Sequence, residues 1–160
     1  MAMDASVRVR PFAPEEWTVL RDVRLAALQD SPDAFYAAYE DTKDRPEASW
    51  RAWPSRGVAL GVWLDGEPVG MVGVATMAEA ARDADLFAMW VAPAARGTGA
   101  ADLLVRGAID WAARQGCTTV SLEVAPGNER AERLYARHRF VRSDGPTMVK
   151  CGQAMRRHLP

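Results

Sequence analysis

The segment RGTGAADLLV, residues Arg96 to Val105, begins a predicted helix in an unusual way. Gly97 and Gly99 stand at its start, although glycine is among the poorest helix formers. The first turn of a helix has unpaired N–H groups and partial positive charge, and a glycine backbone lets an anion come close to them. Arg96 adds a cation beside the turn. The segment therefore predicts a pyrophosphate site, and a tight strand-to-helix turn without a ligand is the alternative.

Two other kinds of phosphate-binding loop do not fit this segment. A Walker A loop needs Lys and then Ser or Thr after its last glycine, where this chain has Ala100 and Ala101. A dinucleotide-binding loop needs a third glycine and follows the first strand of a βαβ unit, and GTGAAD lacks that glycine. Both of these nucleotide sites are therefore disfavoured.

The segments on either side of the loop predict one sheet covered by helices. Apolar residues at helical spacing predict helices over 13–32, in the region 33–57 broken by Pro46, and over 99–115 and 128–138. Apolar runs predict strands over 6–12, in two halves of 57–77 around Asp65-Gly66, over 83–93 and 117–126, and within 140–145 and 147–157. The strands near residues 91 and 120 are joined by a helix, so we expect them to be parallel.

Composition argues against several classes of protein. The chain has 160 residues, which suits one domain, and its formal net charge of −1 gives no basic field for nucleic acid or membranes. The first residues lack the apolar run of a signal peptide, and no stretch approaches the ~18 apolar residues of a membrane span. Two cysteines and two histidines argue against a disulfide scaffold and a zinc cluster. We expect a cytoplasmic protein without a metal, and with no nucleic acid or membrane partner.

Two motifs resemble the Gcn5-related N-acetyltransferase (GNAT) superfamily. The acetyl-CoA loop of that family reads Arg/Gln-x-x-Gly-x-Gly/Ala and is similar to Arg96, Gly99 and Ala101. Its downstream Asn-x-x-Ala-x-x-x-Tyr segment is similar to NERAERLY, which begins at Asn128 and ends at Tyr135. Each motif alone is moderately specific, but the two motifs at this separation, within this element order, make a strong resemblance.

The resemblance implies a fold and a co-substrate. The expected α/β fold is a mixed, mostly antiparallel twisted sheet of six to seven strands with a central parallel pair, flanked by about four helices. It would form a single acetyltransferase domain over residues 1–160, with its core at about 6–152. Acetyl-CoA would be the co-substrate, with no metal. Two positions depart from the family pattern: Ala100 replaces a larger aliphatic residue, and Arg139 stands where glycine often precedes the phenylalanine.

The resemblance also implies the cofactor contacts. The backbone of Met89, Trp90 and Val91 would pair with the amide arm of the cofactor, although the apolar alternation there equally suits core packing of Trp90. The pyrophosphate would be held by the N–H groups of Gly97, Thr98, Gly99, Ala100, Ala101 and Asp102. We expect the Asp102 carboxylate to point to solvent from the first helical turn, where acidic residues are favoured.

Attack of an amine on a thioester needs a proton donor for the thiolate and a proton acceptor for the amine. Tyr135 is the predicted acid, because a phenol with a pKa near 10 can protonate or hydrogen-bond the departing sulfur. Asn128 is seven residues earlier on the same helix face. The resemblance implies that both residues bind the cofactor, and an N-cap asparagine with a half-buried tyrosine is the alternative. Glu123 is the predicted base, since it lies just before the end of its strand. The alternatives are a Glu123 that faces water or pairs with arginine, a chain of water molecules, Asp85, or a carboxylate from the hairpin.

The acceptor side is expected to include SPDAFYAAYED, residues 31–41. Its aromatic side chains beside Asp33, Glu40 and Asp41 would suit a cationic amine, and a solvated acidic helix face is the alternative.

The predicted function is an N-acetyltransferase that transfers an acetyl group from acetyl-CoA directly to a primary amine of a small molecule or a protein N-terminus. A non-catalytic acyl-CoA-binding sensor domain and an acyltransferase for another short acyl-CoA are the alternatives, and a homodimer is compatible with the sequence.

Overall fold

The computed structural model describes residues 6–78 and 81–160. In chain order its elements are β1 (Val7–Pro11), η1 (Pro14–Glu16), α1 (Trp17–Asp30), η2 (Pro32–Ala34), α2 (Tyr39–Thr42), α3 (Glu47–Ala52), β2 (Gly57–Leu64), β3 (Glu67–Thr76), β4 (Asp83–Val91), η3 (Pro93–Ala95), α4 (Ala100–Arg114), β5 (Thr119–Val124), α5 (Glu129–Arg137), β6 (Val141–Ser143) and β7 (Gln153–His158). The strands form one seven-stranded sheet in the order β1-β2-β3-β4-β5-β7-β6. All neighbouring strands are antiparallel except β4 and β5.

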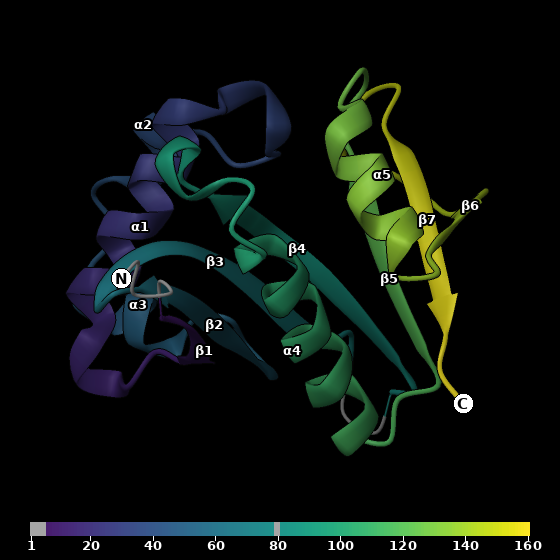
Figure 1. Cartoon of the computed structure of the whole chain (residues 1–160), viewed down its shortest axis with the longest axis horizontal. Helices are drawn as coiled ribbons and strands as arrows, with labels where there is room; N and C mark the ends of the chain where they lie inside the picture. The colour runs from purple at the N-terminus through teal and green to yellow at the C-terminus, as the bar shows by residue number, and fades with distance from the viewer. Residues whose placement is uncertain (1–5, 79–80) are drawn as a thin grey trace, which may run out of the picture.

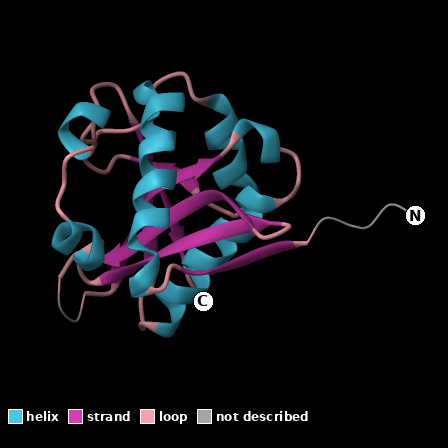
Figure 2. Ribbon diagram, turned by 90° about the vertical axis from the view of Figure 1, so that its left-hand side faces the viewer, coloured by secondary structure: helices cyan, strands magenta, loops and turns pink. Residues whose placement is uncertain are grey.

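Helices cover both faces of the sheet (Figures 1 and 2), and the sheet separates two apolar clusters. Met71 and Val72 are neighbours on β3, so their side chains point to opposite faces, and they belong to different clusters. Val72 packs in the cluster that contains Leu104 of α4. Met71 packs in the cluster that contains Leu20 of α1 and Trp50 of α3. The α4 helix therefore lies on one face, and α1 and α3 lie on the other.

The strands β4 and β5 stay paired over a short distance only. Asp83–Asp85 pair with Thr119–Ser121 in a parallel ladder. Beyond this ladder β4 continues beside β3 and β5 continues beside β7, and Figure 1 shows the two strands diverging. The sheet thus has two arms, β1–β4 and β5–β7–β6, with a free edge of β4 facing the opening between them.

A β-bulge lies in the diverging part of β4. Met71 pairs with Trp90 and Gly73 pairs with Phe87, so β4 has one residue more than β3 between these two pairs. Ala88, inside the bulge, has a φ of 55°, which is rare for residues other than glycine. Because a bulge bends its strand and interrupts regular pairing, it turns this part of the β4 backbone away from an ideal ladder.

The observed architecture confirms the predicted fold class. Within residues 6–78 and 81–160 the sheet has seven strands and one parallel pair. The same residues form five α-helices where about four were expected, because the region 33–57 contains two short helices on either side of Pro46. The strands near residues 91 and 120 are parallel as expected. They pair at residues 83–85, however, and Val91 lies at the diverging end of β4. No described helix is both long enough and apolar enough to cross a membrane.

Candidate functional site

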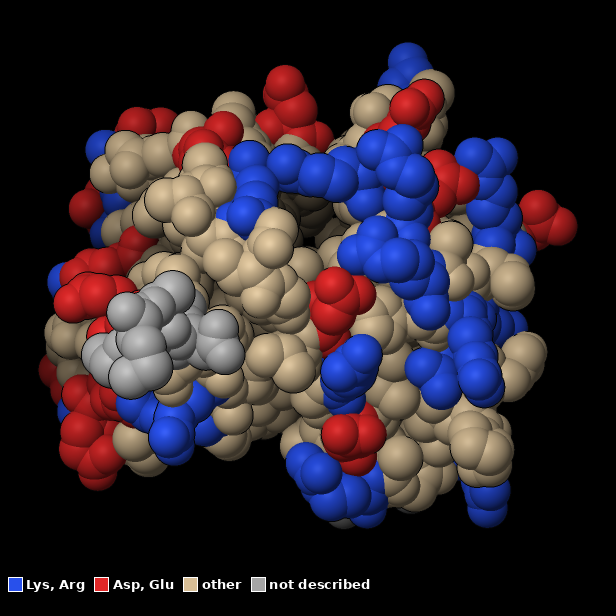
Figure 3. All heavy atoms as spheres, in the orientation of Figure 1, with Lys and Arg blue, Asp and Glu red and all other residues tan. Residues whose placement is uncertain are grey.

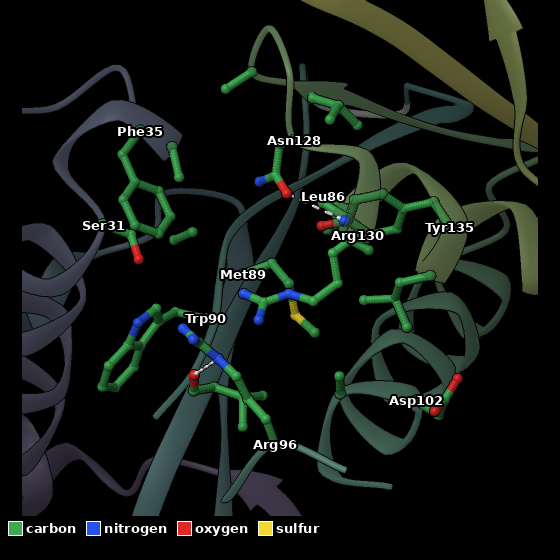
Figure 4. Close-up of a pocket in the computed structure, with 18 of the residues that line it drawn as sticks. Ser31, Phe35, Leu86, Met89, Trp90, Arg96, Asp102, Asn128, Arg130 and Tyr135 are labelled. Carbon is green, nitrogen blue, oxygen red and sulfur yellow. Dashed lines mark hydrogen bonds between the residues drawn. The ribbon is translucent and has the colours of Figure 1, made fainter. Parts of the chain in front are cut away.

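A pocket of about 360 Å³ lies where β4 and β5 diverge. Its walls come from Leu86–Val91 of β4, the loop and helix start at residues 95–102, the end of β5, the side of α5, and Ser31 and Phe35 after α1 (Figure 4). Segments that lie far apart in the sequence therefore meet around one cavity at the free edge of β4.

The loop before α4 is built on two left-handed glycines. Gly97 has a φ of 81° and Gly99, the N-cap of α4, has a φ of 86°. Residues with a side chain rarely adopt these angles, which explains both glycines. The first helical hydrogen bond runs from the Leu103 N–H to the Gly99 carbonyl, at 3.1 Å. The N–H groups of Ala100, Ala101 and Asp102 therefore lie in the first turn, where a helix supplies no backbone acceptor.

Arg96 is fixed beside this turn by hydrogen bonds. Its Nε donates to the Val91 carbonyl at 3.2 Å, and its Nη2 donates to Asp30 Oδ2 at 3.2 Å. The indole N–H of Trp90 donates to the same Asp30 oxygen at 3.0 Å. The Trp90 bond, with contributions from Ser31 and Arg96, holds the pKa of the Asp30 carboxyl below its usual range. Asp30 therefore joins the end of α1 to the free edge of β4.

Asp102 does not point freely to solvent, contrary to our expectation. Its Oδ1 lies 2.7 Å from His138 Nε2 and 3.3 Å from Arg137 Nη2. Burial raises the pKa of this carboxyl, but the hydrogen bond with His138 and the charge of Arg137 outweigh burial, so the pKa lies below its ordinary value. The carboxylate instead joins the start of α4 to the end of α5.

Asn128 and Tyr135 come from the α5 side of the pocket. Asn128 Oδ1 accepts a hydrogen bond from the Ala131 N–H at 3.2 Å and so caps α5. Tyr135 is only 5% exposed, and its ring lies edge-on to Phe140 with 5.8 Å between the ring centroids. Figure 4 shows Tyr135 directed from α5 toward the pocket. Burial raises the pKa of its phenol, which therefore stays protonated and can donate a hydrogen bond.

Glu123 lies near the end of β5, and both of its carboxylate oxygens accept backbone hydrogen bonds. The Val149 N–H donates to Oε1 at 2.6 Å and the Met148 N–H donates to Oε2 at 2.8 Å. Gly152 also packs closely, because a Cβ there would lie 2.7 Å from Oε1. Glu123 thus holds the loop between β6 and β7 against β5. Each oxygen keeps a further lone pair for another donor.

The model of the acetyltransferase (GNAT) family matches residues 24–140 of this chain. The chain belongs to this family. The matched region runs from α1 to the end of α5, so it includes the pocket walls on β4, α4, β5 and α5.

Solved structures of GNAT proteins share the fold over nearly the whole chain. An acetyltransferase of the GNAT family from Streptococcus pneumoniae is 20% identical, with a TM-score of 0.78 over 97% of this chain and 100% of its own. The structure of yncA from Salmonella typhimurium with its cofactor acetyl-CoA is 15% identical, with a TM-score of 0.76 over 96% and 94%. The paia N-acetyltransferase from Thermoplasma acidophilum, in complex with coenzyme A, is 16% identical, with a TM-score of 0.74 over 96% and 99%. None of the curated proteins matches the chain.

Most of the predicted cofactor residues of this GNAT protein line the pocket between β4 and β5. Those that line it are Met89, Trp90, Val91, Arg96, Gly97, Gly99, Ala101, Asp102, Asn128 and Tyr135. Thr98 and Ala100 do not: the Thr98 hydroxyl donates to the Ala95 carbonyl at 2.5 Å, and Ala100 is 1% exposed in the core. The predictions did not include Arg130 and Arg137, which also line the pocket.

Basic side chains border this GNAT pocket. Figure 4 shows Arg130 extending from the start of α5 across the pocket, and Figure 3 shows Lys and Arg side chains gathered beside the opening and over the α5 arm. The sequence signal for Arg130 was its position two residues after Asn128, in the first turn of α5. Together with Arg96, these groups make the pocket attractive to anions.

A second pocket, of about 400 Å³, adjoins the first and shares Phe35, Ala88 and Glu123 with it. The acidic residues expected to receive a cationic amine are not part of it. Glu40 pairs with Lys43 at 2.7 Å, and neither Asp33 nor Asp41 lines either pocket. These three carboxylates therefore lie outside both pockets, as the alternative of a solvated acidic helix face implies.

Asp85, the alternative base, lies in the paired segment of β4 and lines neither pocket. Burial, with a smaller contribution from the charge of Asp83, raises the pKa of its carboxyl. Among residues 6–78 and 81–160, no group of three His, Cys, Asp or Glu side chains is arranged to hold a metal ion.

Proposed function

We infer that this GNAT protein is an N-acetyltransferase, which transfers the acetyl group of acetyl-CoA directly to a primary amine of a small molecule or a protein N-terminus. The observation that carries this proposal is one pocket in which three features meet. These are a helix start with two left-handed glycines, an unpaired edge of β4, and a buried, protonated Tyr135.

The residues of the pocket fit coenzyme A part by part. The turn from Gly97 to Asp102 would hold the diphosphate with its N–H groups, and Arg96 and Arg130 add charge beside it. The β4 edge at Met89–Val91 would bind the amide arm as an added strand. When bound, the coenzyme supplies the acetyl group as a thioester.

The reaction forms a carbon–nitrogen bond and breaks a carbon–sulfur bond. The neutral amine attacks the thioester carbon, the nitrogen gives up a proton, and the sulfur leaves as a thiolate that takes a proton. Tyr135 is our candidate donor to this sulfur, since its phenol is protonated and faces the pocket. The backbone at Trp90 or Val91 would polarise the thioester carbonyl.

Glu123 is our candidate acceptor for the amine proton. It lines both pockets, and each of its oxygens keeps a lone pair beside the bonds from Met148 and Val149. Because both carboxylate oxygens already accept those two hydrogen bonds, a chain of water molecules is the competing route for the proton.

Release of free coenzyme A thiol over a panel of amines tests the proposal, with calorimetry to measure acetyl-CoA binding. We expect binding and amine-dependent thiol release. Binding without release on any amine would favour an acyl-CoA sensor domain instead. Faster release from propionyl-CoA or succinyl-CoA would assign another short acyl donor. Absence of binding by any acyl-CoA would reject the proposal.

A further inference from the structure

The second pocket contains a buried cation. Arg24 lines this pocket and is only 8% exposed, and its buried Nη1 has no hydrogen-bond partner among residues 6–78 and 81–160. Among the described residues, no carboxylate forms an ion pair with its guanidinium. Arg24 stands on the core-facing side of α1, one turn from Leu20 and Leu28. A buried charge at a position that suits an apolar residue is costly, so its presence needs an explanation.

The aromatic and basic neighbours of Arg24 neither accept ordinary hydrogen bonds from its guanidinium nor neutralise its charge. Its guanidinium lies 4.9 Å from the centroid of the Phe35 ring and 6.0 Å from that of Trp53. Such aromatic faces stabilise a cation weakly but accept no ordinary hydrogen bond. Arg45 also lines the pocket. Burial lowers the pKa of Arg24 to about 10, and the like charge of Arg45 adds to the shift. In the part of the chain that the structure describes, this side of the pocket is therefore positive.

A negative charge lines the second pocket where it adjoins the first pocket. Glu123 belongs to both pockets, and among the described residues it is the one acidic side chain that lines the second. A ligand in the second pocket would thus meet the two arginines and, on the side of the proposed acetyl donor, the carboxylate of Glu123. Such a pocket is complementary to a molecule with an ammonium group and a carboxylate.

Resting on the N-acetyltransferase function, we propose that the acceptor is a small α-amino acid with an apolar side chain, whose carboxylate binds Arg24 and whose amine lies toward Glu123. A guanidinium matches a carboxylate in shape and charge. The apolar side chain would contact Phe35, Trp53 and the exposed rim residues Tyr36 and Met148, which are 69% and 66% exposed. A polyamine would be repelled by Arg24 and Arg45, and a protein N-terminus carries no carboxylate beside its amine.

Matched pairs of acceptors test this proposal. L-phenylalanine is compared with phenethylamine, and L-leucine with isoamylamine, since each pair differs in the carboxylate alone. We expect kcat/KM from thiol release to favour each amino acid by about 10- to 100-fold, the range of one charge-assisted hydrogen bond. In Arg24→Met the ratio of kcat/KM for the amino acid to that for the amine should fall to about 1. Arg24→Lys should retain part of the preference, because lysine keeps the charge but not the planar fork.

Arg21→Met is the matched control. Arg21 lies on the same helix, pairs with Asp22 at 3.0 Å and lines neither pocket, so its loss should leave the amino acid preference unchanged. Since Arg24→Met removes an unpaired buried charge, it should keep the fold. Its melting temperature and acetyl-CoA affinity, measured beside those of the wild type, establish that the protein is intact.

The possible outcomes distinguish failure of the proposed acceptor from failure of the proposed N-acetyltransferase function. Amines acetylated without preference for a carboxylate, or a preference that survives in Arg24→Met, would overturn the proposed acceptor and leave the N-acetyltransferase function standing. Calorimetry of L-phenylalanine with the coenzyme A-loaded protein tests whether the amino acid binds even if it is not acetylated. Binding that depends on Arg24 without any turnover would support the carboxylate site and reject the acetyltransferase. No binding and no turnover of the amino acids would overturn the proposed acceptor.

Discussion

Removing one oxygen from Tyr135 separates its proposed chemistry from its packing. Tyr135→Phe keeps the ring against Phe140, so we expect an intact fold and an acetyl-CoA affinity close to that of the wild type. The thiolate loses its proton donor, and kcat should fall by about 10- to 10,000-fold. Tyr39→Phe, which changes a tyrosine outside both pockets, is the control. An unchanged kcat in Tyr135→Phe would remove the residue from the mechanism.

The pH dependence of Tyr135 has a definite direction. Burial disfavours the phenolate, so the pKa of Tyr135 lies above the ordinary value of about 10 and the acid form persists as pH rises. The wild-type rate should therefore show no loss of the acid up to about pH 10. A descending limb near pH 8 that disappears in Tyr135→Phe would contradict the burial of this hydroxyl.

Arg139 has a backbone conformation that favours glycine. Its φ is 67°, and the Phe140 N–H donates to the Tyr135 carbonyl at 3.1 Å, which places Arg139 at the left-handed position that ends α5. Arg139→Gly should raise the free energy of unfolding by about 0.5–1 kcal/mol, because glycine removes the strain of that angle but adds unfolded-state entropy.

Urea unfolding of Arg139→Gly beside Arg133→Gly checks this expectation. Arg133 lies within α5, where glycine should instead lower the free energy of unfolding by about 1 kcal/mol. The two substitutions make the same chemical change with opposite expected signs. A loss of stability in both would show that the angle at Arg139 carries no strain.

Single residues also show how far the sequence could predict the site. The spacing placed Asn128 and Tyr135 on one face of a helix, and both line the pocket, because helical periodicity is a local property. The partners of Glu123 and Trp90 could not be foreseen. Met148 is 25 residues from Glu123, and Asp30 is 60 residues from Trp90. Such contacts depend on how distant segments pack, which periodicity does not reveal.

At the scale of elements, the glycine turn before α4 allows a matched comparison. Gly99 and Gly66 both have a φ of 86°, and a Cβ on either would meet no atom within 4 Å. Alanine at each site should therefore cost a similar 1–2 kcal/mol, roughly, in folding stability. Only Gly99→Ala changes the turn that would hold the diphosphate, so it alone should weaken acetyl-CoA binding, by about tenfold or more in calorimetry. Equal affinity in the two variants would argue against a coenzyme at this turn.

The helices and strands could be predicted from the sequence, but the strand pairing that creates the pocket could not. Apolar periodicity and the prolines at 14, 32, 46 and 54 delimited the helices and strands, because these signals act within a few residues. The bulge in β4 appears only in the register of Met71 and Gly73 against the neighbouring strand. The sequence predicted a parallel pair near Val91, whereas the ladder ends at Asp85.

At the scale of the whole molecule, the two arms of the sheet are joined by a ladder of three residue pairs, and the coenzyme is expected to fill the opening beyond it. Hydrogen exchange measures this directly. Acetyl-CoA should slow exchange in peptides from Leu86–Val91 and from residues 97–102, because it adds acceptors to backbone N–H groups at both places. ADP has the diphosphate but no amide arm, so at saturation it should protect residues 97–102 and leave Leu86–Val91 unchanged. The β1–β2 pair, remote from the opening, reports any general stabilisation, which amounts to about 2.7 kcal/mol at a ligand concentration 100 times Kd. A result in which acetyl-CoA slows exchange at Leu86–Val91 no more than in the β1–β2 pair would contradict the binding of the coenzyme's amide chain along β4 as an added strand.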